Sequence, residues 1–242
     1  MKNTHTQHCV DILRAQCKAE SKRPFLARGI NVIRCSNCLM AEFACFCHLR
    51  AQQACPVEFI LLFHRDEIHK PTNSGRLIAD LFPNDTKAYV WSRTAPSDEL
   101  IQHLNRKKEQ CTVLFPHTDT AQGQNRKQRV LFTPIQHENQ KHCFIILDGT
   151  WKQASKMFHQ SEWLKHIPHF ELSSAAQRSF LVRHASHDMQ FATAEVTAML
   201  LHTLGHESQS QQLLHYYQTF NERCLMSRKR GNDSVMLDNT KQ

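Results

Sequence analysis

The sequence predicts a mixed α/β domain with a mainly parallel sheet, and two observations carry this prediction. Short runs that are apolar at both alternating positions are typical of strands buried on both faces of a parallel sheet. They alternate with stretches whose apolar residues recur every three or four positions, as on one face of a helix. Such alternation indicates an α/β architecture. The strand-like runs cover residues 57–63, 88–92, 112–116 and 143–147.

The helical stretches are predicted from apolar spacing and from one terminal signal. The spaced apolar residues are Leu77, Ile78 and Leu81 in the first stretch, Trp151, Ala154 and Phe158 in the second, and Val196, Met199, Leu200 and Leu204 in the third. Gly205 follows the third stretch, where a glycine commonly ends a helix. A last amphipathic stretch, residues 211–230, ends in a basic tip, and the residues after Arg230 are expected to fray.

Bulk composition is that of a globular chain. The 242 residues are 40% hydrophobic, enough for a sizeable core, and carry a net charge of +8, which favours polyanionic partners. No stretch approaches the roughly 20 apolar residues of a membrane span, and residues 1–16 lack the apolar core of a signal peptide. We therefore expect a cytoplasmic protein without a membrane partner. The expected division is an N-terminal segment over 1–55, a main domain over 56–205 and a C-terminal helix with a flexible tail over 206–242.

Four of the ten cysteines lie within thirteen residues, as Cys35, Cys38, Cys45 and Cys47. The Cys-x2-Cys half is a metal-binding turn, and four thiolates close a tetrahedral zinc site without an open position for chemistry. The second pair is spaced more tightly than usual, so Cys55 or His48 remains an alternative ligand. The sequence thus predicts a structural zinc ion in the N-terminal segment.

Asp148 is an acidic residue at the end of the apolar run 143–147. In open α/β sheets, ligands bind beyond the carboxyl ends of the strands. Two interpretations are open. Asp148 either caps the helix that follows, with Trp151 packed beneath it as a core anchor, or belongs to a ligand site.

Two further helix starts are rich in polar residues. Residues 71–76, with the sequence PTNSGR, follow the first strand-like run and offer hydroxyls, a glycine and an arginine, a set that suits an anion. Another segment contains Arg183 and then Thr193 and Glu195 at a helix start, where Thr193 is equally suited to capping. Three polar helix starts in one α/β domain are compatible with a shared ligand site.

Asp148, Gly149, Thr150 and Trp151 spell a D-x-T-W motif, and with it the chain resembles the bacterial type of DTW-domain tRNA-uridine aminocarboxypropyltransferase. The resemblance runs from about RPFLARG to TAEV. It includes, in order, the four-cysteine cluster, KPTNSGRLIADLFP, WSRTAPS, LFP, LDGTW with KMF, and the TAE helix. It implies a SPOUT-like knotted α/β domain preceded by the zinc-binding segment. It also implies transfer of the 3-amino-3-carboxypropyl group from S-adenosylmethionine to uridine N3 at position 47 of the tRNA variable loop, with release of methylthioadenosine.

The chemistry of this transfer suggests roles for particular residues. Asp148 would be the general base, Thr150 would orient Asp148 or the ribose, and Trp151 would line the pocket or stack on a base. Arg76, Arg183 or the N–H groups of the helix starts would hold the carboxylate of S-adenosylmethionine. The expected binding residues for this co-substrate are Thr72, Asn73, Ser74, Gly75, Arg76, Leu147, Asp148, Gly149, Arg183, Thr193 and Glu195.

The tRNA partner would be held through basic segments, for which residues 21–29, 104–108, 124–129 and 227–230 are the candidates. Two alternative functions stay open at this point. One is an aminocarboxypropyl- or methyltransferase on the same fold that acts on ribosomal RNA, and the other is a zinc-bearing RNA-binding protein without catalysis. The second would have no need of Asp148 at a strand end.

Overall fold

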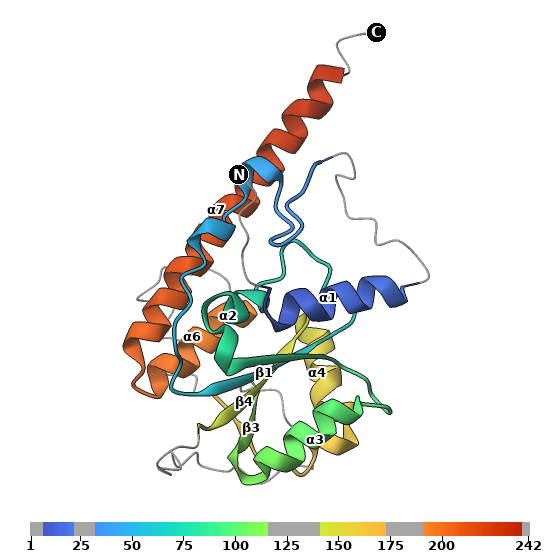
Figure 1. Cartoon of the computed structure of the whole chain (residues 1–242), viewed down its shortest axis with the longest axis vertical. Coiled ribbons are helices and arrows are strands. Elements are labelled where there is room, and N and C mark those ends of the chain that lie inside the picture. Colours follow the sequence, from blue (N-terminus) through green and yellow to red (C-terminus); the bar gives the residue numbers. More distant parts are fainter. Residues whose placement is uncertain (1–6, 22–31, 116–140, 173–190, 239–242) are drawn as a thin grey trace.

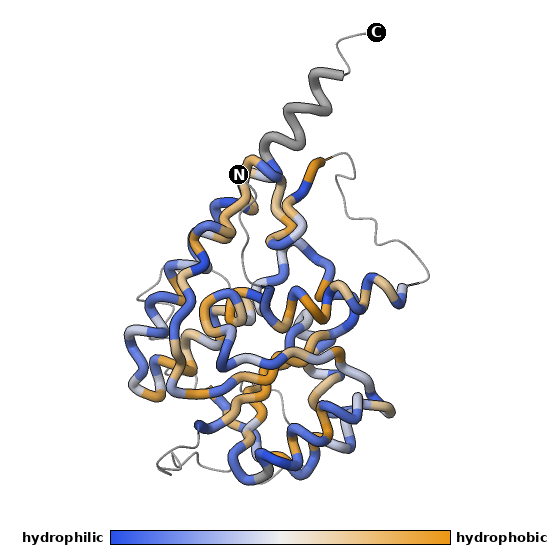
Figure 2. Tube along the Cα trace, in the orientation of Figure 1, coloured by the Kyte–Doolittle hydropathy of each residue, from blue (hydrophilic) through white to orange (hydrophobic). Residues whose placement is uncertain are grey.

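A single sheet of five parallel strands forms the centre of the protein (Figure 1). The computed structural model describes residues 7–21, 32–115, 141–172 and 191–238. The spatial order is β2-β1-β4-β3-β5, and the apolar strands β1, β4 and β3 run through the middle of the molecule (Figure 2). The strands are β1 (Glu58–Phe63), β2 (Thr86–Val90), β3 (Cys111–Leu114), β4 (Cys143–Asp148) and β5 (His169–Phe170). The predicted parallel α/β sheet is confirmed, and only the two-residue strand β5 was not predicted.

Helices cover both faces of the sheet. The α-helices are α1 (Cys9–Glu20), α2 (Arg76–Leu81), α3 (Asp98–Lys107), α4 (Trp151–Gln160), α6 (Thr193–Thr203) and α7 (Glu207–Asp238). Short 3-10 turns are η1 (Glu42–Ala44), η2 (Cys47–Leu49), η3 (Pro83–Asp85), η4 (Lys108–Gln110) and η5 (Glu162–Leu164). Because side chains alternate along a strand, Phe59, Leu61 and Phe63 of β1 join a core with α1, α2, α6 and α7. Ile60 and Leu62 join a second core with α3 and α4.

The two central strands send the chain to opposite faces of the sheet. After β1 the chain reaches α2, which belongs to the first core, whereas after β4 it enters α4, which belongs to the second. β1 and β4 are neighbours, with Phe63 in register with Asp148. Adjacent parallel strands whose connections leave on opposite faces form a topological switch point, where open α/β sheets bind their ligands. The fold therefore places the expected ligand crevice at the carboxyl ends of β1 and β4.

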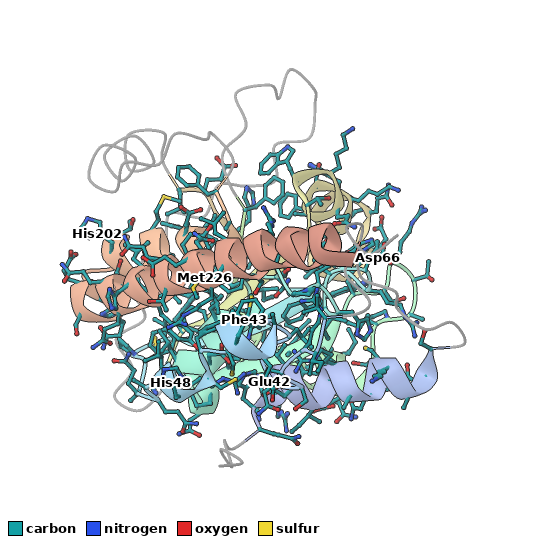
Figure 3. All side chains as sticks on the ribbon, turned by 90° about the horizontal axis from the view of Figure 1, so that it is seen from above. Glu42, Phe43, His48, Asp66, His202 and Met226 are labelled. Atoms are coloured by element: carbon teal, nitrogen blue, oxygen red, sulfur yellow. The ribbon has the colours of Figure 1, made fainter. Side chains whose placement is uncertain are left out.

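The N-terminal and C-terminal parts pack together on one side of the sheet. The segment with η1 lies along α7, and seen from above Phe43 and Met226 mark this contact (Figure 3). Met40 lies 3.9 Å from Cys224, sulfur to sulfur. The core that includes β1 also contains residues from both of these parts. They are Val10 of α1, Phe46 of the cysteine segment and Phe220 of α7. The three predicted parts thus share a core, and the boundaries at residues 55 and 205 remain a prediction.

Helix α6 ends as the sequence predicts. Gly205 has a φ of +81°, its N–H donates to the carbonyl of His202, and the N–H of His206 donates to the carbonyl of Leu201. This pair of bonds is the Schellman motif, which needs a residue that tolerates left-handed backbone. Helix α7 begins earlier than predicted and continues to Asp238, so the fraying expected after Arg230 is not observed between Arg230 and Asp238.

No helix in the described ranges is long and apolar enough to cross a membrane. The knot expected from the resemblance stays a prediction, since residues 173–190, just before α6, lie outside the described part of the chain.

Candidate active site at the carboxyl ends of β1 and β4

Asp148 ends β4 with only 2% of its surface exposed. Its Oδ1 accepts a hydrogen bond of 2.6 Å from Nδ2 of Asn73, and its backbone carbonyl accepts one from the N–H of His64. The amide orientation of Asn73 is fixed, because its Oδ1 accepts from the N–H of Arg76, the first residue of α2. Asn73 therefore links the first residue of α2 to the carboxyl of Asp148.

Gly75 allows the carboxyl of Asp148 to lie directly on the backbone that leads into α2. A Cβ atom at position 75 would be only 1.6 Å from Oδ2 of Asp148. Any side chain there would displace the carboxyl, so this close approach requires glycine. Among the described residues, no donor makes a hydrogen bond of good geometry to Oδ2, although that atom is buried. One oxygen of Asp148 is thus held by Asn73, while the other is buried without a hydrogen bond of good geometry to the described residues.

The pKa of Asp148 is raised to about 7. Burial is the main cause, because it penalises the charged form, and the negative charge of Glu67 adds to it. The hydrogen bond from Asn73 and the nearby Thr193 side chain and Gly75 N–H favour the charged form and limit the rise. Asp148 thus changes between acid and base near neutral pH, which suits a group that accepts a proton during a reaction.

The start of α6 lies against the start of α2. The N–H of Ala194 is 3.5 Å from Oγ of Ser74, and Thr193 is close enough to Asp148 to lower its pKa. The structure thus brings together helix starts that are more than a hundred residues apart in the chain. The Glu195 side chain caps its own helix, since its Oε2 accepts the N–H of Ala192 at 2.8 Å at the start of α6.

Thr150, not Asp148, caps helix α4. Its hydroxyl accepts the N–H of Gln153, while Oε1 of Gln153 accepts the N–H of Thr150 at 2.7 Å, which completes a capping box. The interpretation of Asp148 as a cap is thereby wrong. The interpretation of Trp151 as a buried core anchor is also wrong, because 44% of its surface is exposed. The Trp151 ring stacks on Phe115, with centroids 5.8 Å apart, and this support leaves it accessible to a planar ligand.

His64 is a site residue that the sequence analysis missed. It follows β1 directly, as Gly149 follows β4, and its ring stacks on Trp91 with centroids 5.9 Å apart. Because Oε1 of Gln153 is used in the capping box, Nε2 of Gln153 donates to Nδ1 of His64 at 3.1 Å. Nδ1 is therefore an acceptor, and in the neutral ring Nε2 carries the proton. The position directly after a buried strand, which singled out Asp148, is the signal that would have found His64.

Other predicted binding residues are placed differently. Arg76 is directed into the interior, where its guanidinium contacts Phe46 and Phe220 and pairs with Asp80, so its expected role as a carboxylate clamp is corrected. The Leu147 side chain lies in the second core, while Thr72 is exposed near the site. Gly149 approaches Gln153 and His64 closely. Arg183 lies outside the described residues.

The four predicted zinc ligands lie together. Their sulfur atoms are within 4.8 Å of one another, with 3.7 Å between Cys35 and Cys47 and 3.8 Å between Cys38 and Cys45. A tetrahedral zinc site with bonds of about 2.3 Å separates its sulfurs by about 3.8 Å, so the cluster fits zinc. The alternative ligands Cys55 and His48 are not members of this group.

The basic segments are only partly described. Arg106 and Arg228 are exposed, whereas Lys107 pairs with Glu58 at 2.8 Å. Residues 22–29 and 124–129 lie outside the described ranges, as do the side chains of Lys108, Lys229 and Arg230. The predicted RNA-binding surface thus stays a prediction.

Comparison with known proteins places this geometry in a family. The DTW domain family matches residues 32–225, which include the cysteine cluster, β1, β4 and α6. The chain is 23% identical over 184 residues to tRNA-uridine aminocarboxypropyltransferase 2 of Macaca fascicularis, an alignment that covers 74% of this chain and 59% of that relative. No solved structure matches. Because the match spans most of the chain and contains the D-x-T-W motif at the end of β4, the protein belongs to the DTW domain family.

Proposed function

We propose that this protein is a tRNA-uridine aminocarboxypropyltransferase that transfers the 3-amino-3-carboxypropyl group of S-adenosylmethionine to uridine N3. Family membership and the name of the relative support the general activity. The observation that carries the chemical assignment is Asp148, a buried carboxyl with a pKa raised to about 7 at the switch point of the sheet. A bare RNA-binding module has no use for such a group.

Asp148 supplies the base that the acceptor requires. Uridine N3 carries a proton and becomes nucleophilic when the proton leaves, so the carboxylate takes it as N3 bonds to the first carbon of the aminocarboxypropyl chain. The bond from that carbon to sulfur breaks, its electron pair stays on sulfur, and methylthioadenosine leaves. The sulfonium has three carbon substituents, so the residues around the site must align the chain carbon, rather than the methyl group, with N3.

His64 and Trp151 complete the acceptor side. Deprotonated uridine spreads its negative charge onto its carbonyl oxygens, and the Nε2–H of His64 is a donor suited to one of them. Its tautomer is set by Gln153, so it acts as a donor rather than as a second base. The exposed face of Trp151, backed by Phe115, offers a stacking surface for a base of the substrate.

The donor side is assigned to the two helix starts that meet at Asp148. Ser74 and Thr193 contribute hydroxyls there, and Asn73 and Gly75 position the backbone. Arg183 remains the candidate for the carboxylate of S-adenosylmethionine. The variable loop of tRNA at position 47 is the proposed acceptor site, supported by the resemblance of the ordered motifs and by the net charge of +8.

Nucleoside analysis of cellular tRNA tests this proposal. Total tRNA from cells that lack the gene is compared by mass spectrometry with tRNA from cells complemented by the wild-type gene or by its Asp148→Asn variant. We expect aminocarboxypropyluridine in tRNA only with the wild-type gene. The modification in ribosomal RNA alone, or a methylated nucleoside instead, would contradict the proposed substrate or reaction.

A further inference from the structure

Three arginines from distant parts of the chain have buried side chains around the four-cysteine segment. Nη2 of Arg14, in α1, donates to the backbone carbonyl of Asn37, which lies between Cys35 and Cys38, at 2.8 Å. Arg50 follows η2, and its backbone N–H donates to the carbonyl of Cys47, so its side chain starts directly beside this ligand.

Arg76, the third arginine, contacts the cysteine segment through an aromatic ring. Its guanidinium carbon lies 5.3 Å from the ring centroid of Phe46, the residue between Cys45 and Cys47, and only 2% of its surface is exposed. Each of the three arginines therefore contacts the loop that carries the zinc ligands.

Two carboxylates face these arginines. Asp11 lies 2.8 Å from Arg14 and 3.3 Å from Arg50, and Asp80 lies 2.9 Å from Arg50 and 3.5 Å from Arg76. Although burial opposes its ionisation, the hydrogen bond with His8 and the charges of Arg76 and Arg50 hold the pKa of Asp80 at about 2. Three guanidinium groups against two carboxylates leave one positive charge uncompensated in this interior cluster.

Several nitrogens of the cluster also lack partners. Nε and Nη2 of Arg76, Nη2 of Arg50 and Nη1 of Arg14 are buried and make no hydrogen bond to the described residues. An uncompensated charge in the interior is costly unless another charge balances it. The cluster is therefore expected to face a negative charge nearby.

The metal site supplies that charge when it is filled. Four thiolates around one Zn²⁺ ion carry two net negative charges, and the outer partners of a metal site tune its affinity. We infer that Arg14, Arg50 and Arg76 form the counter-charge of the zinc tetrathiolate, so that Arg76 serves the metal site rather than S-adenosylmethionine. This inference does not depend on the proposed reaction.

The arrangement also connects the metal site with the candidate active site. Arg76 is the first residue of α2, directly after Gly75, on which the carboxyl of Asp148 lies. The guanidinium that balances the zinc ligands is thus fixed to the same turn that positions Asp148.

Zinc affinity of Arg76 variants tests the inference. Purified zinc-loaded protein is titrated with a chromogenic chelator, with Arg76→Met to remove the charge, Arg76→Lys to keep it, and Arg106→Met on the exposed face of α3 as the control. We expect Arg76→Met to weaken zinc binding about 10- to 100-fold, Arg76→Lys to restore most of it, and the control to match the wild type.

Three results would contradict the inference. Wild-type affinity in Arg76→Met would show that the residue does not support zinc binding, and equal weakening by Met and Lys would show that it acts through packing. Either result would overturn the inference, as would a wild-type protein without bound zinc. If Arg76→Met does not fold, the Arg50→Met and Arg50→Lys pair decides by the same criterion.

Discussion

Replacing Asp148 by asparagine is expected to stabilise the protein at alkaline pH while it removes the proposed activity. The raised pKa means that the folded state resists ionisation of this carboxyl, so its contribution to stability is fully present below about pH 4 and is lost as pH rises from there through about 7. The shift from 3.8 to about 7 lowers the free energy of unfolding above pH 7 by about 4 kcal/mol, relative to its value at low pH. Asparagine does not ionise and escapes this loss.

The substitution also has a cost, which follows from the contacts of Asp148 itself. The side-chain carbonyl of the introduced asparagine takes the place of Oδ1 and still accepts from Asn73. Its amide nitrogen takes the place of Oδ2, against Gly75, where an unsatisfied donor costs about 1–3 kcal/mol. We therefore expect Asp148→Asn to be about 1–3 kcal/mol more stable than the wild type at pH 8. At pH 5 the wild-type carboxyl is protonated in the folded state, so the advantage should vanish or reverse.

Urea unfolding at pH 5 and pH 8 measures the difference. Asp85→Asn is the matched control, because Asp85 is also a buried carboxylate but accepts the N–H of Cys55 and pairs with Lys141, so its loss should destabilise the protein at pH 8. If Asp148→Asn destabilised the protein at pH 8 as much as the control does, the argument from the raised pKa would be refuted.

The same variant separates binding from turnover. It should still bind S-adenosylmethionine and tRNA but lose turnover by about 10²- to 10⁴-fold, the usual contribution of a positioned base. In the wild type, the rate should rise with pH through about 7 as Asp148 loses its proton. Near-normal turnover in the folded variant would end the assignment of Asp148 as the base.

Substitutions at four other positions probe the surroundings of Asp148 and the cysteine cluster. Glu67→Gln removes a charge that raises the pKa of Asp148, so the pH–rate profile should move to lower pH; an unchanged profile would contradict this. Gly75→Ala places a Cβ atom 1.6 Å from Oδ2 of Asp148 and should abolish turnover, and an active variant would show that the carboxyl can move without loss. Trp151→Ala should weaken substrate RNA binding by about 1–3 kcal/mol while Trp151→Phe keeps most of it, as gel-shift titrations would show; equal loss in both would argue against stacking. Cys45→Ser should lower zinc content and melting temperature together, and a wild-type zinc content measured by mass spectrometry would remove this residue from the ligand set.

The sequence predicts the sheet well because its strands are buried on both faces. Runs such as residues 143–147 are apolar throughout, and a parallel sheet covered by helices imposes that pattern. The end of α6 at Gly205 is equally predictable, since left-handed backbone favours glycine. The two-residue strand β5 carries no pattern long enough to detect, and it forms because it pairs with Val113 and Leu114 of β3. Such tertiary pairing is invisible in a local window.

The candidate site is only partly predictable from the sequence, because contacts between distant segments decide where some of its residues lie. Asp148 is conspicuous as a lone acid after an apolar run, and the tetrahedral fit of the cysteines follows from their spacing. The polar residues beside Arg76 in the chain suggest that it binds the carboxylate of S-adenosylmethionine. Its guanidinium instead packs against Phe46 and Phe220, which are far away in sequence. Its spacing of four residues from Asp80 was the local sign of an ion pair on α2.

Transfer of labelled carbon from S-adenosylmethionine tests the central claim most directly. Purified protein is incubated with an unmodified tRNA transcript and S-adenosylmethionine labelled either in the aminocarboxypropyl chain or in the methyl group. We predict that chain label enters uridine while methyl label leaves in methylthioadenosine, and that Asp148→Asn abolishes both. Methyl label in the RNA, or no label in RNA that the protein binds, would contradict the proposed reaction.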